Sequence, residues 1–147
     1  MQQKTVGIFL FNEVEVLDFA GPFEVFSLAE SENSSERAFR VCTIARTNAP
    51  IRARNGLTVL PASDFSSAPK LDLLIVPGGY GAEELEIREP ETIRWLQSMA
   101  GQVEIVASIC TGAFLLAEAG LLNGKRATTH WMDLDRLGRE YPAVQVL

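Results

Sequence analysis

The sequence predicts an α/β domain in which helices cover both faces of a parallel sheet. Apolar strand-like and helix-like stretches alternate along the chain without repeats or low-complexity tracts, which is typical of this architecture. The chain has 147 residues, 47% of them hydrophobic and 22% charged. This composition suffices for one domain with one sizeable core, so we expect residues 1–147 to form a single domain.

The pattern of apolar residues assigns the elements in order. We expect strands at 6–11, 38–45, 71–76, 103–106, 127–129 and from 143 onward, helices at 19–29, 90–100, 111–119 and 133–140, and a hairpin at 51–60. The first helix carries a stripe of Phe19, Phe23 and Phe26, with a proline tolerated in its first turn. The hairpin is expected to turn at Asn55-Gly56, a dipeptide that favours a tight reversal.

Cys110 stands between a predicted buried strand and a predicted helix that Gly120 can close. A residue at such a junction projects at the carboxyl edge of the sheet, where open α/β folds bind ligands. The free N–H groups and the positive dipole end of the helix favour thiolate, so we expect the pKa of Cys110 to be depressed. Cys110 is therefore a candidate nucleophile. Cys42, inside a strand, is interpreted as a small inert core residue.

A second strand end leads into a glycine-rich turn, Pro77-Gly78-Gly79-Tyr80-Gly81, at the same edge. A Gly-Gly pair lets backbone N–H groups approach a ligand and suits an oxyanion hole, although an ordinary turn is the alternative. Tyr80 could equally line a pocket or be a surface aromatic. The glycine spacing does not fit a dinucleotide fingerprint, so nicotinamide and flavin cofactors are not expected.

Charge and composition exclude several classes of partner. The net charge is −6 and the pI is about 4.8, with arginines scattered, which argues against binding nucleic acid or an anionic membrane. No apolar run reaches the about 18 residues of a membrane-spanning helix. One histidine and isolated carboxylates do not make a metal site. Two cysteines far apart in sequence are typical of a cytoplasmic protein.

Five motifs, in this order, make the chain resemble the ThiJ/PfpI superfamily, which has the class I glutamine amidotransferase-like fold. They are LDFAGPFEVF, RARNGLTVLP, LLIVPGGYG, SICTGAFLLAEAGLLNGKRATTHW and REYPAV. The resemblance implies a flavodoxin-like three-layer sandwich with a cysteine at a nucleophile elbow. Relatives continue through a further strand and helix, so the resemblance implies that the sandwich is incomplete at Leu147. It also implies a homodimer with the elbow near the interface.

The resemblance assigns roles to residues around Cys110. Asp18 matches the carboxylate that faces the cysteine, and a carboxyl beside a thiolate should be a protonated acid with a raised pKa. Its alternative role is the N-cap of the following helix. Gly79 and Thr111 match the backbone N–H donors. His130 matches a nearby histidine and is interpreted as a lining residue, because peptidase relatives place their histidine where Thr111 stands.

Two branches of the superfamily resemble this chain most, the isonitrile hydratases and the sensor domains of AraC-type regulators. The first implies an enzyme in which Cys110, Asp18 and Thr111 convert an isocyanide to an N-formyl amine without a cofactor. The second implies a domain that senses a small molecule without chemistry, followed by a DNA-binding region. A third interpretation is a redox or stress-response protein whose cysteine is oxidised.

Overall fold

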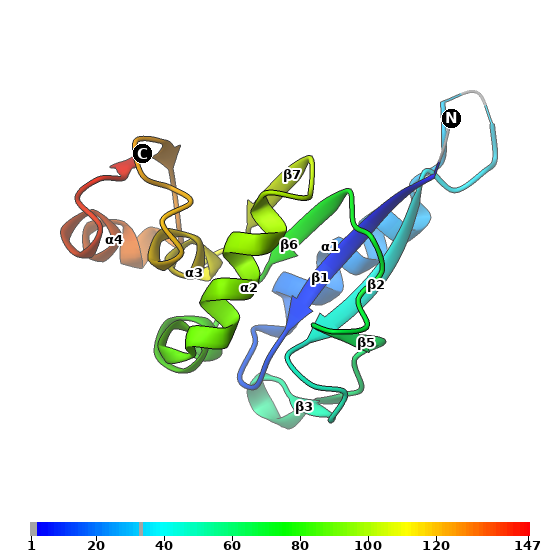
Figure 1. Ribbon diagram of the computed structural model, residues 1–147, viewed down its shortest axis with the longest axis horizontal. Helices are drawn as coiled ribbons and strands as arrows, with labels where there is room; N and C mark the ends of the chain where they lie inside the picture. The colour runs from blue at the N-terminus through cyan, green and yellow to red at the C-terminus, as the bar shows by residue number, and fades with distance from the viewer. Residues whose placement is uncertain (1–2, 33) are drawn as a thin grey trace.

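The computed structural model describes residues 3–32 and 34–147, whose centre is a five-stranded, all-parallel sheet in the order β5-β2-β1-β6-β7 (Figure 1). The strands of this sheet are β1 (Lys4–Leu10), β2 (Phe39–Ala45), β5 (Ser63–Asp64), β6 (Leu73–Val76) and β7 (Ile105–Ser108). The predicted α/β class with a parallel sheet is confirmed. The strand order reverses direction between β1 and β6, which makes their carboxyl ends the expected place for a ligand.

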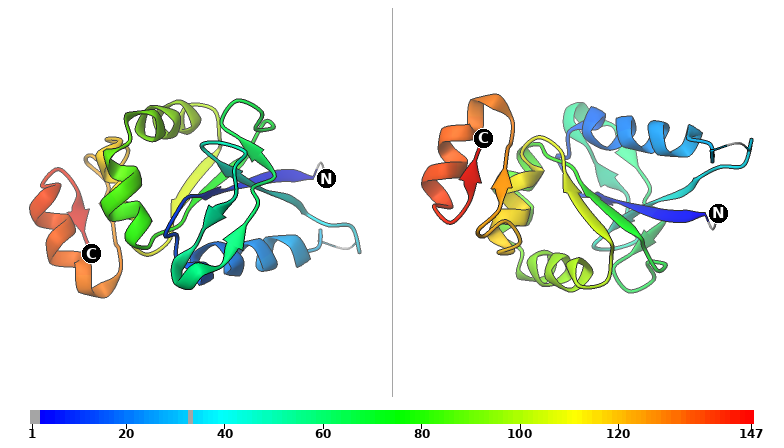
Figure 2. Two further views of the ribbon diagram at one scale, coloured as in Figure 1. Left: turned by 90° about the horizontal axis from the view of Figure 1, so that it is seen from below. Right: turned by 90° about the horizontal axis from the view of Figure 1, so that it is seen from above.

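Helices lie on both faces of this sheet. Helix α1 (Val16–Leu28) and helix α2 (Pro90–Ala100) cover opposite faces, as the two views of Figure 2 show. Helix α3 (Gly112–Glu118) follows β7 directly, and six of its seven residues are buried. The three layers agree with the predicted sandwich, and no helix in residues 3–32 or 34–147 combines the length and apolarity needed to cross a membrane.

The C-terminal segment forms a small lobe beside the sheet. Strands β8 (Arg126–Ala127) and β9 (Gln145–Val146) pair in parallel with each other, and helix α4 (Leu134–Glu140) connects them. Its apolar side chains, with Leu137 and Val144 buried, pack onto Phe114 of α3. In Figures 1 and 2 this lobe lies at the end of the molecule opposite the N-terminus. The predicted helix at 133–140 is therefore present, the strand predicted at 127–129 is shifted to Arg126–Ala127, and the terminal strand is short.

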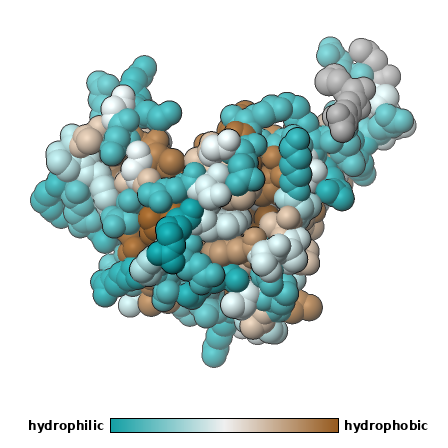
Figure 3. Space-filling model, in the orientation of Figure 1, coloured by the Kyte–Doolittle hydropathy of each residue, from teal (hydrophilic) through white to brown (hydrophobic). Residues whose placement is uncertain are grey.

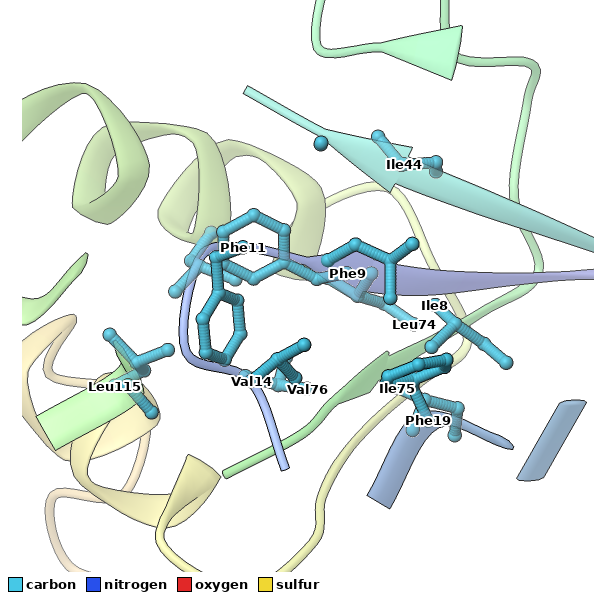
Figure 4. Packing of buried hydrophobic residues seen from close by; sticks show 14 of the residues in the cluster. Ile8, Phe9, Phe11, Val14, Phe19, Ile44, Leu74, Ile75, Val76 and Leu115 are labelled. Carbon is cyan, nitrogen blue, oxygen red and sulfur yellow. The ribbon is translucent and has the colours of Figure 1, made fainter. Parts of the chain in front are cut away.

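The main core fills the space between the sheet and its helices. The chain carries Phe9, Phe11 and Val14 into this core as it runs from β1 into the next loop. Leu115 of α3 belongs to the same cluster (Figure 4). The Phe9 ring also lies 5.5 Å from the Trp95 ring of α2. Every residue of β6 is buried, as expected for a central parallel strand covered on both faces. Burying such side chains contributes about 1.5–3 kcal/mol each.

The predicted hairpin at 51–60 is present and turns where expected. Strands β3 (Ile51–Arg52) and β4 (Thr58–Val59) pair antiparallel around a single 3-10 turn at Arg54–Gly56. Asn55 and Gly56 both have positive φ, 60° and 90°, which is the conformation that asparagine and glycine tolerate best. The hairpin is hydrogen-bonded to the loop before α1, because Glu13 N–H donates to Arg52 O over 2.8 Å.

Some boundaries differ from the predictions. Helix α1 begins at Val16 rather than Phe19, so Pro22 lies in its interior and not in its first turn. Pro22 has no backbone N–H to donate to the carbonyl of Asp18, so α1 lacks one hydrogen bond there. Packing against the sheet stabilises the helix in spite of this loss. Phe23 is 41% exposed, so the predicted stripe is buried only at Phe19 and half-buried at Phe26.

Three short segments were not predicted at all. They are strand β5, the π-helical turn Gly81–Leu85 and the 3-10 turn Glu86–Arg88. A further 3-10 turn, Trp131–Asp133, precedes α4. Segments of two to five residues leave no periodicity to detect, so sequence patterns cannot separate them from loops.

Candidate functional site

Cys110 occupies a sharp elbow between β7 and α3. Its backbone has φ of 53°, a left-handed conformation that is uncommon for a residue with a side chain and concentrates at functional sites. Two hydrogen bonds fix the elbow. Ile109 N–H donates to Val76 O over 3.0 Å, and Thr129 Oγ1 donates to Cys110 O over 3.0 Å. The predicted strand, sharp turn and helix are therefore present, with Thr111 as the N-cap residue of α3. The prediction that the strand is buried is wrong, because β7 forms the edge of the sheet and none of its residues is buried.

The glycine-rich turn after β6 lies directly against this elbow. A Cβ on Gly78 would come within 2.6 Å of Thr111 N, so only glycine permits the contact. Gly79 has φ of 109°, which other residues rarely adopt. Its N–H donates to Thr111 Oγ1 over 2.9 Å. The Gly79 N–H, predicted as a donor to a bound ligand, is therefore occupied by the Thr111 hydroxyl in this structure.

Asp18 reaches the same place from the first turn of α1. Its carboxylate accepts a hydrogen bond from Gly78 N–H over 3.1 Å and interacts with the Cys110 thiol. Burial raises the pKa of Asp18, and the nearby Glu15 charge adds to this effect, while these hydrogen bonds oppose it. The raised pKa agrees with the prediction. The alternative N-cap role is wrong, because Glu15 occupies the N-cap position of α1.

The expected depressed pKa of Cys110 is wrong. Partial burial raises the pKa of the thiol, and the charges of Asp18 and Asp133 raise it further. Hydrogen bonds from the Thr111 N–H and hydroxyl act in the lowering direction but do not reverse the shift. The prediction counted the helix end and the neighbouring Asp18 but not the burial of the thiol, which is the largest contribution, or the charge of Asp133. Cys42 also has a pKa raised by burial, and its Sγ donates to Val6 O over 3.6 Å.

The structure places His130 and Tyr80 at the margin of this cluster. His130 Nδ1 accepts a hydrogen bond from Met132 N–H over 3.3 Å, and its ring lies close enough to Asp18 for a positive charge to lower the pKa of that carboxyl. This agrees with a lining residue rather than the partner of Cys110. Tyr80 is 49% exposed at the start of the π-helical turn.

Three residues near Cys110 were missed by sequence reasoning. Thr129 holds the elbow carbonyl, Asp133 adds a negative charge, and Glu83 interacts with the Thr111 hydroxyl. The TTHW stretch was a usable signal for Thr129. Glu83 follows the glycine-rich turn by two residues, but only the unpredicted π-helical turn directs it back to the elbow.

The candidate site lies apart from the largest groove described. That groove, about 600 Å³, runs along the free edge of β7 between Val103, Ile105 and Leu121, and Cys110 does not line it.

Exposed apolar side chains from several elements include Leu17, Trp131 and Met132. Figure 3 shows such apolar residues as patches on a largely hydrophilic face. Within residues 3–32 and 34–147, no cluster of His, Cys, Asp or Glu could hold a metal ion.

The arrangement places a thiol near a carboxyl group, and burial raises the pKa of both. Such a pair can add a nucleophilic sulfur and a proton to one substrate atom. These groups follow the carboxyl ends of β1, β6 and β7, and the strand order changes direction between β1 and β6.

Comparisons with known proteins agree with this geometry. The chain is 37% identical to the isonitrile hydratase of Pseudomonas putida over 132 residues, 90% of this chain and 54% of that protein. It is 30% identical to the HTH-type transcriptional regulator GbdR of Pseudomonas aeruginosa over 141 residues, 96% of this chain and 38% of that protein. The chain thus spans about half or less of the length of these relatives.

A solved structure extends the likeness to the fold. A ThiJ/PfpI family protein from Pseudomonas syringae superposes with a TM-score of 0.83 and 25% sequence identity, over 99% of this chain and 57% of that one. The DJ-1/PfpI family matches residues 4–146, which include the elbow, the glycine-rich turn and Asp18. By sequence, fold and the layout of these strand ends, the chain belongs to the DJ-1/PfpI family.

Proposed function

We propose that this chain carries the site of a cysteine-dependent hydratase, which adds water to an isocyanide to give an N-formyl amine. The observation that carries the proposal is that Cys110, at its left-handed elbow, and Asp18 converge on the same glycine-rich turn: the Asp18 carboxylate accepts the Gly78 N–H over 3.1 Å, and Gly78 packs against Thr111, the residue after Cys110. Similarity to an isonitrile hydratase over 90% of the chain supports the substrate class.

The chemistry matches what an isocyanide requires. Its terminal carbon accepts a nucleophile and a proton at the same atom. Cys110 Sγ attacks that carbon, and Asp18 delivers a proton to the carbon and takes up the proton released by the thiol, giving a thioimidate, R–N=CH–S–Cys. Water then adds to the same carbon, one of its protons passing to the nitrogen and the other through Asp18 to the departing sulfur. The product R–NH–CHO leaves and the thiol is restored, with no oxidant or cofactor consumed.

The raised pKa values of both groups favour this use. An ionised thiolate beside an ionised carboxylate would have no proton to deliver to carbon. Burial and mutual repulsion instead keep at least one proton between Asp18 and Cys110 near neutral pH. Thr111 contributes hydrogen bonds to sulfur from its N–H and its hydroxyl. A thiol and a carboxylic acid held in contact therefore suit the proposed addition.

The test is conversion of a simple isocyanide to its formamide, followed by ultraviolet absorbance in the native chain, Cys110→Ser and Cys42→Ser. We expect turnover in the native chain and in Cys42→Ser, and none in Cys110→Ser. Full turnover in Cys110→Ser would exclude the thioimidate. A folded native chain without turnover would exclude hydration by these residues.

The alternative is a ligand-sensing domain without chemistry. The match to a transcriptional regulator over 96% of this chain favours it. Titration calorimetry with the same isocyanide and its formamide separates the two functions: a sensor binds a ligand without converting it. The redox interpretation is less well supported, because a raised pKa leaves less of the thiolate that reacts with oxidants.

The homodimer and the cytoplasmic location remain parts of this proposal. Helix α1 exposes Leu17, Val25 and Leu28, at 76%, 67% and 54% of their surfaces. An apolar helix face of this kind fits the interface expected near the elbow. Sedimentation equilibrium tests it directly, since Val25→Glu should then shift the chain from dimer to monomer.

A further inference from the structure

The backbone carbonyl of Cys110 is held by a residue of the C-terminal lobe. Thr129, which follows β8 by two residues, donates a hydrogen bond from Oγ1 to Cys110 O over 3.0 Å. In the described part of the chain, the other donor to this carbonyl is Ala113 N–H, at 3.4 Å. The bond from Thr129 is therefore the shorter of the two, and it is the one that comes from outside the elbow.

Fixing this carbonyl also fixes the N–H group at the other end of the same peptide. The carbonyl of Cys110 and the N–H of Thr111 belong to one planar trans peptide, so they point in opposite directions. No backbone carbonyl in residues 3–32 or 34–147 accepts the Thr111 N–H. Gly78 packs against Thr111 N, where a Cβ would come within 2.6 Å. The bond from Thr129 thus determines the direction of an N–H that is available to the site.

We propose that Thr129 is a positioning residue for Cys110. Its hydroxyl holds the left-handed elbow and keeps the Thr111 N–H directed at the reacting groups. A residue with a side chain stays in a left-handed conformation, here φ of 53° at Cys110, only where surrounding contacts hold it. Without the hydroxyl, Cys110 O keeps only the 3.4 Å bond from Ala113, and the elbow and the N–H can move together. The effect on turnover rests on the proposed function.

Thr128 provides a matched control. Its Oγ1 donates to Leu147 O over 3.0 Å, which is the same kind of bond, at the same length, as the bond from Thr129 to Cys110 O. The Thr128 bond joins two parts of the C-terminal lobe and does not reach the elbow. Valine in place of either threonine removes the hydroxyl donor and keeps a side chain of similar shape. The two variants therefore differ in whether the lost bond reaches Cys110.

The first measurement is the rate at which iodoacetamide alkylates Cys110, followed across pH in the full chain with Cys42→Ala. We expect Thr129→Val to slow alkylation at neutral pH roughly three- to tenfold and to move the pH profile upward, because the thiolate loses an aligned N–H donor. Thr128→Val should stay within about twofold of the parent. Thr129→Ser should restore the parent rate and profile, since serine keeps the hydroxyl.

The charges that face Cys110 are the same in all of these variants. Asp18 from α1 and Asp133 from the turn before α4 both raise the pKa of the thiol, and His130 bears on Asp18. Threonine, valine and serine are all neutral. A profile that moves in Thr129→Val and returns in Thr129→Ser therefore reports the hydrogen bond and not the surrounding field.

Turnover of an isocyanide is the second measurement. Thr129→Val should lower kcat roughly three- to tenfold and leave KM within about twofold, because the Thr111 N–H acts on the reacting groups and not on the rest of the substrate. A loss of stability alone would leave kcat unchanged at temperatures where the variant is fully folded. Thermal melting identifies that range, and Thr129→Ala replaces Thr129→Val if the latter does not fold.

Alkylation needs no isocyanide, so the two proposals fail separately. If the native chain does not hydrate an isocyanide but the alkylation profile moves in Thr129→Val alone, the function is wrong and the role of Thr129 stands. An unchanged profile in a folded Thr129→Val protein would overturn the role of Thr129 whether or not hydration occurs. An equal change in Thr128→Val, or no recovery in Thr129→Ser, would overturn it as well.

Discussion

Cys110 owes its properties to residues that lie far from it in the sequence. The left-handed elbow costs of the order of 1–3 kcal/mol, and hydrogen bonds to Thr129 and to β6 hold it in place. Asp18 and Asp133 add negative charge from two other elements. At the scale of single residues, the sulfur therefore stands in a partly buried position and a negative field, both of which disfavour its ionisation.

Asp18→Asn tests this balance, because it should change ionisation and turnover in opposite senses. Removing the negative charge lowers the pKa of Cys110, so the ultraviolet absorbance of the thiolate should develop at lower pH. Isocyanide turnover should nevertheless fall by at least about 100-fold, since the general acid is lost.

The control for Asp18→Asn is Glu24→Gln, which removes one charge from an exposed position of the same helix. Neither the thiolate titration nor turnover should change in this control. Undiminished turnover in Asp18→Asn, with the control behaving as expected, would remove Asp18 from the mechanism.

At the scale of elements, the site depends on how closely two strand ends approach. The turn after β6 touches the elbow after β7 through Gly78, where a Cβ would lie 2.6 Å from Thr111 N and 2.9 Å from Gly112 N. These contacts are to backbone atoms, which cannot rotate away. Gly78→Ala should therefore separate the two turns and disturb the hydrogen bond from Gly78 N–H to Asp18.

We expect Gly78→Ala to reduce the free energy of unfolding by about 1–3 kcal/mol, measured by urea denaturation, and to reduce turnover as well. Gly21→Ala is the comparison, since a Cβ there meets nothing within 4 Å and the residue lies inside α1. That change should be neutral or stabilising by up to about 1 kcal/mol. Equal stability of the two variants would show that the close approach is not required.

The elements that were predictable are those with local signals. The hairpin at Asn55-Gly56 and helix α2 from Pro90 are encoded by residues within them, and both occur as predicted. Helix α1 starts three residues earlier than predicted, because Pro22 was taken as a first-turn marker although sheet packing stabilises it in the interior. The resemblance to the superfamily predicted that Asp18, Cys110 and Thr111 belong to the candidate site.

What could not be predicted came from tertiary contacts. Partial burial is the largest cause of the raised pKa of Cys110, and Asp133, which is brought to the elbow by the C-terminal lobe, adds to it. Glu83 turns toward Thr111 only because the segment after the glycine-rich turn adopts a π-helical conformation. Neither arrangement leaves a periodic or compositional trace in the sequence.

At the scale of the whole molecule, buried carboxyls connect the site to stability. Burial raises the pKa values of Asp18, Glu83 and Glu86. Glu86 is 5% exposed and accepts a hydrogen bond of 2.6 Å from the buried Thr92 hydroxyl, but burial outweighs this bond. Just above the ordinary carboxyl pKa of about 4, the folded state therefore holds more protons than the unfolded state.

The free energy of unfolding should therefore fall as pH rises above the ordinary carboxyl pKa. The stabilisation by these buried carboxyls is complete only below that pKa. Urea midpoints measured at about pH 4.5, 5 and 5.5, just above the ordinary carboxyl pKa, should decrease in that order. The combined variant Asp18→Asn, Glu83→Gln, Glu86→Gln should flatten the trend. Asp64→Asn should not flatten the trend. Hydrogen bonds from Ser66 and Ser67 lower the pKa of Asp64 to about 2, so the contribution of Asp64 to stability is lost only in stronger acid. A midpoint that rises with pH would mean that these carboxyls are paired in the folded state more completely than the structure indicates.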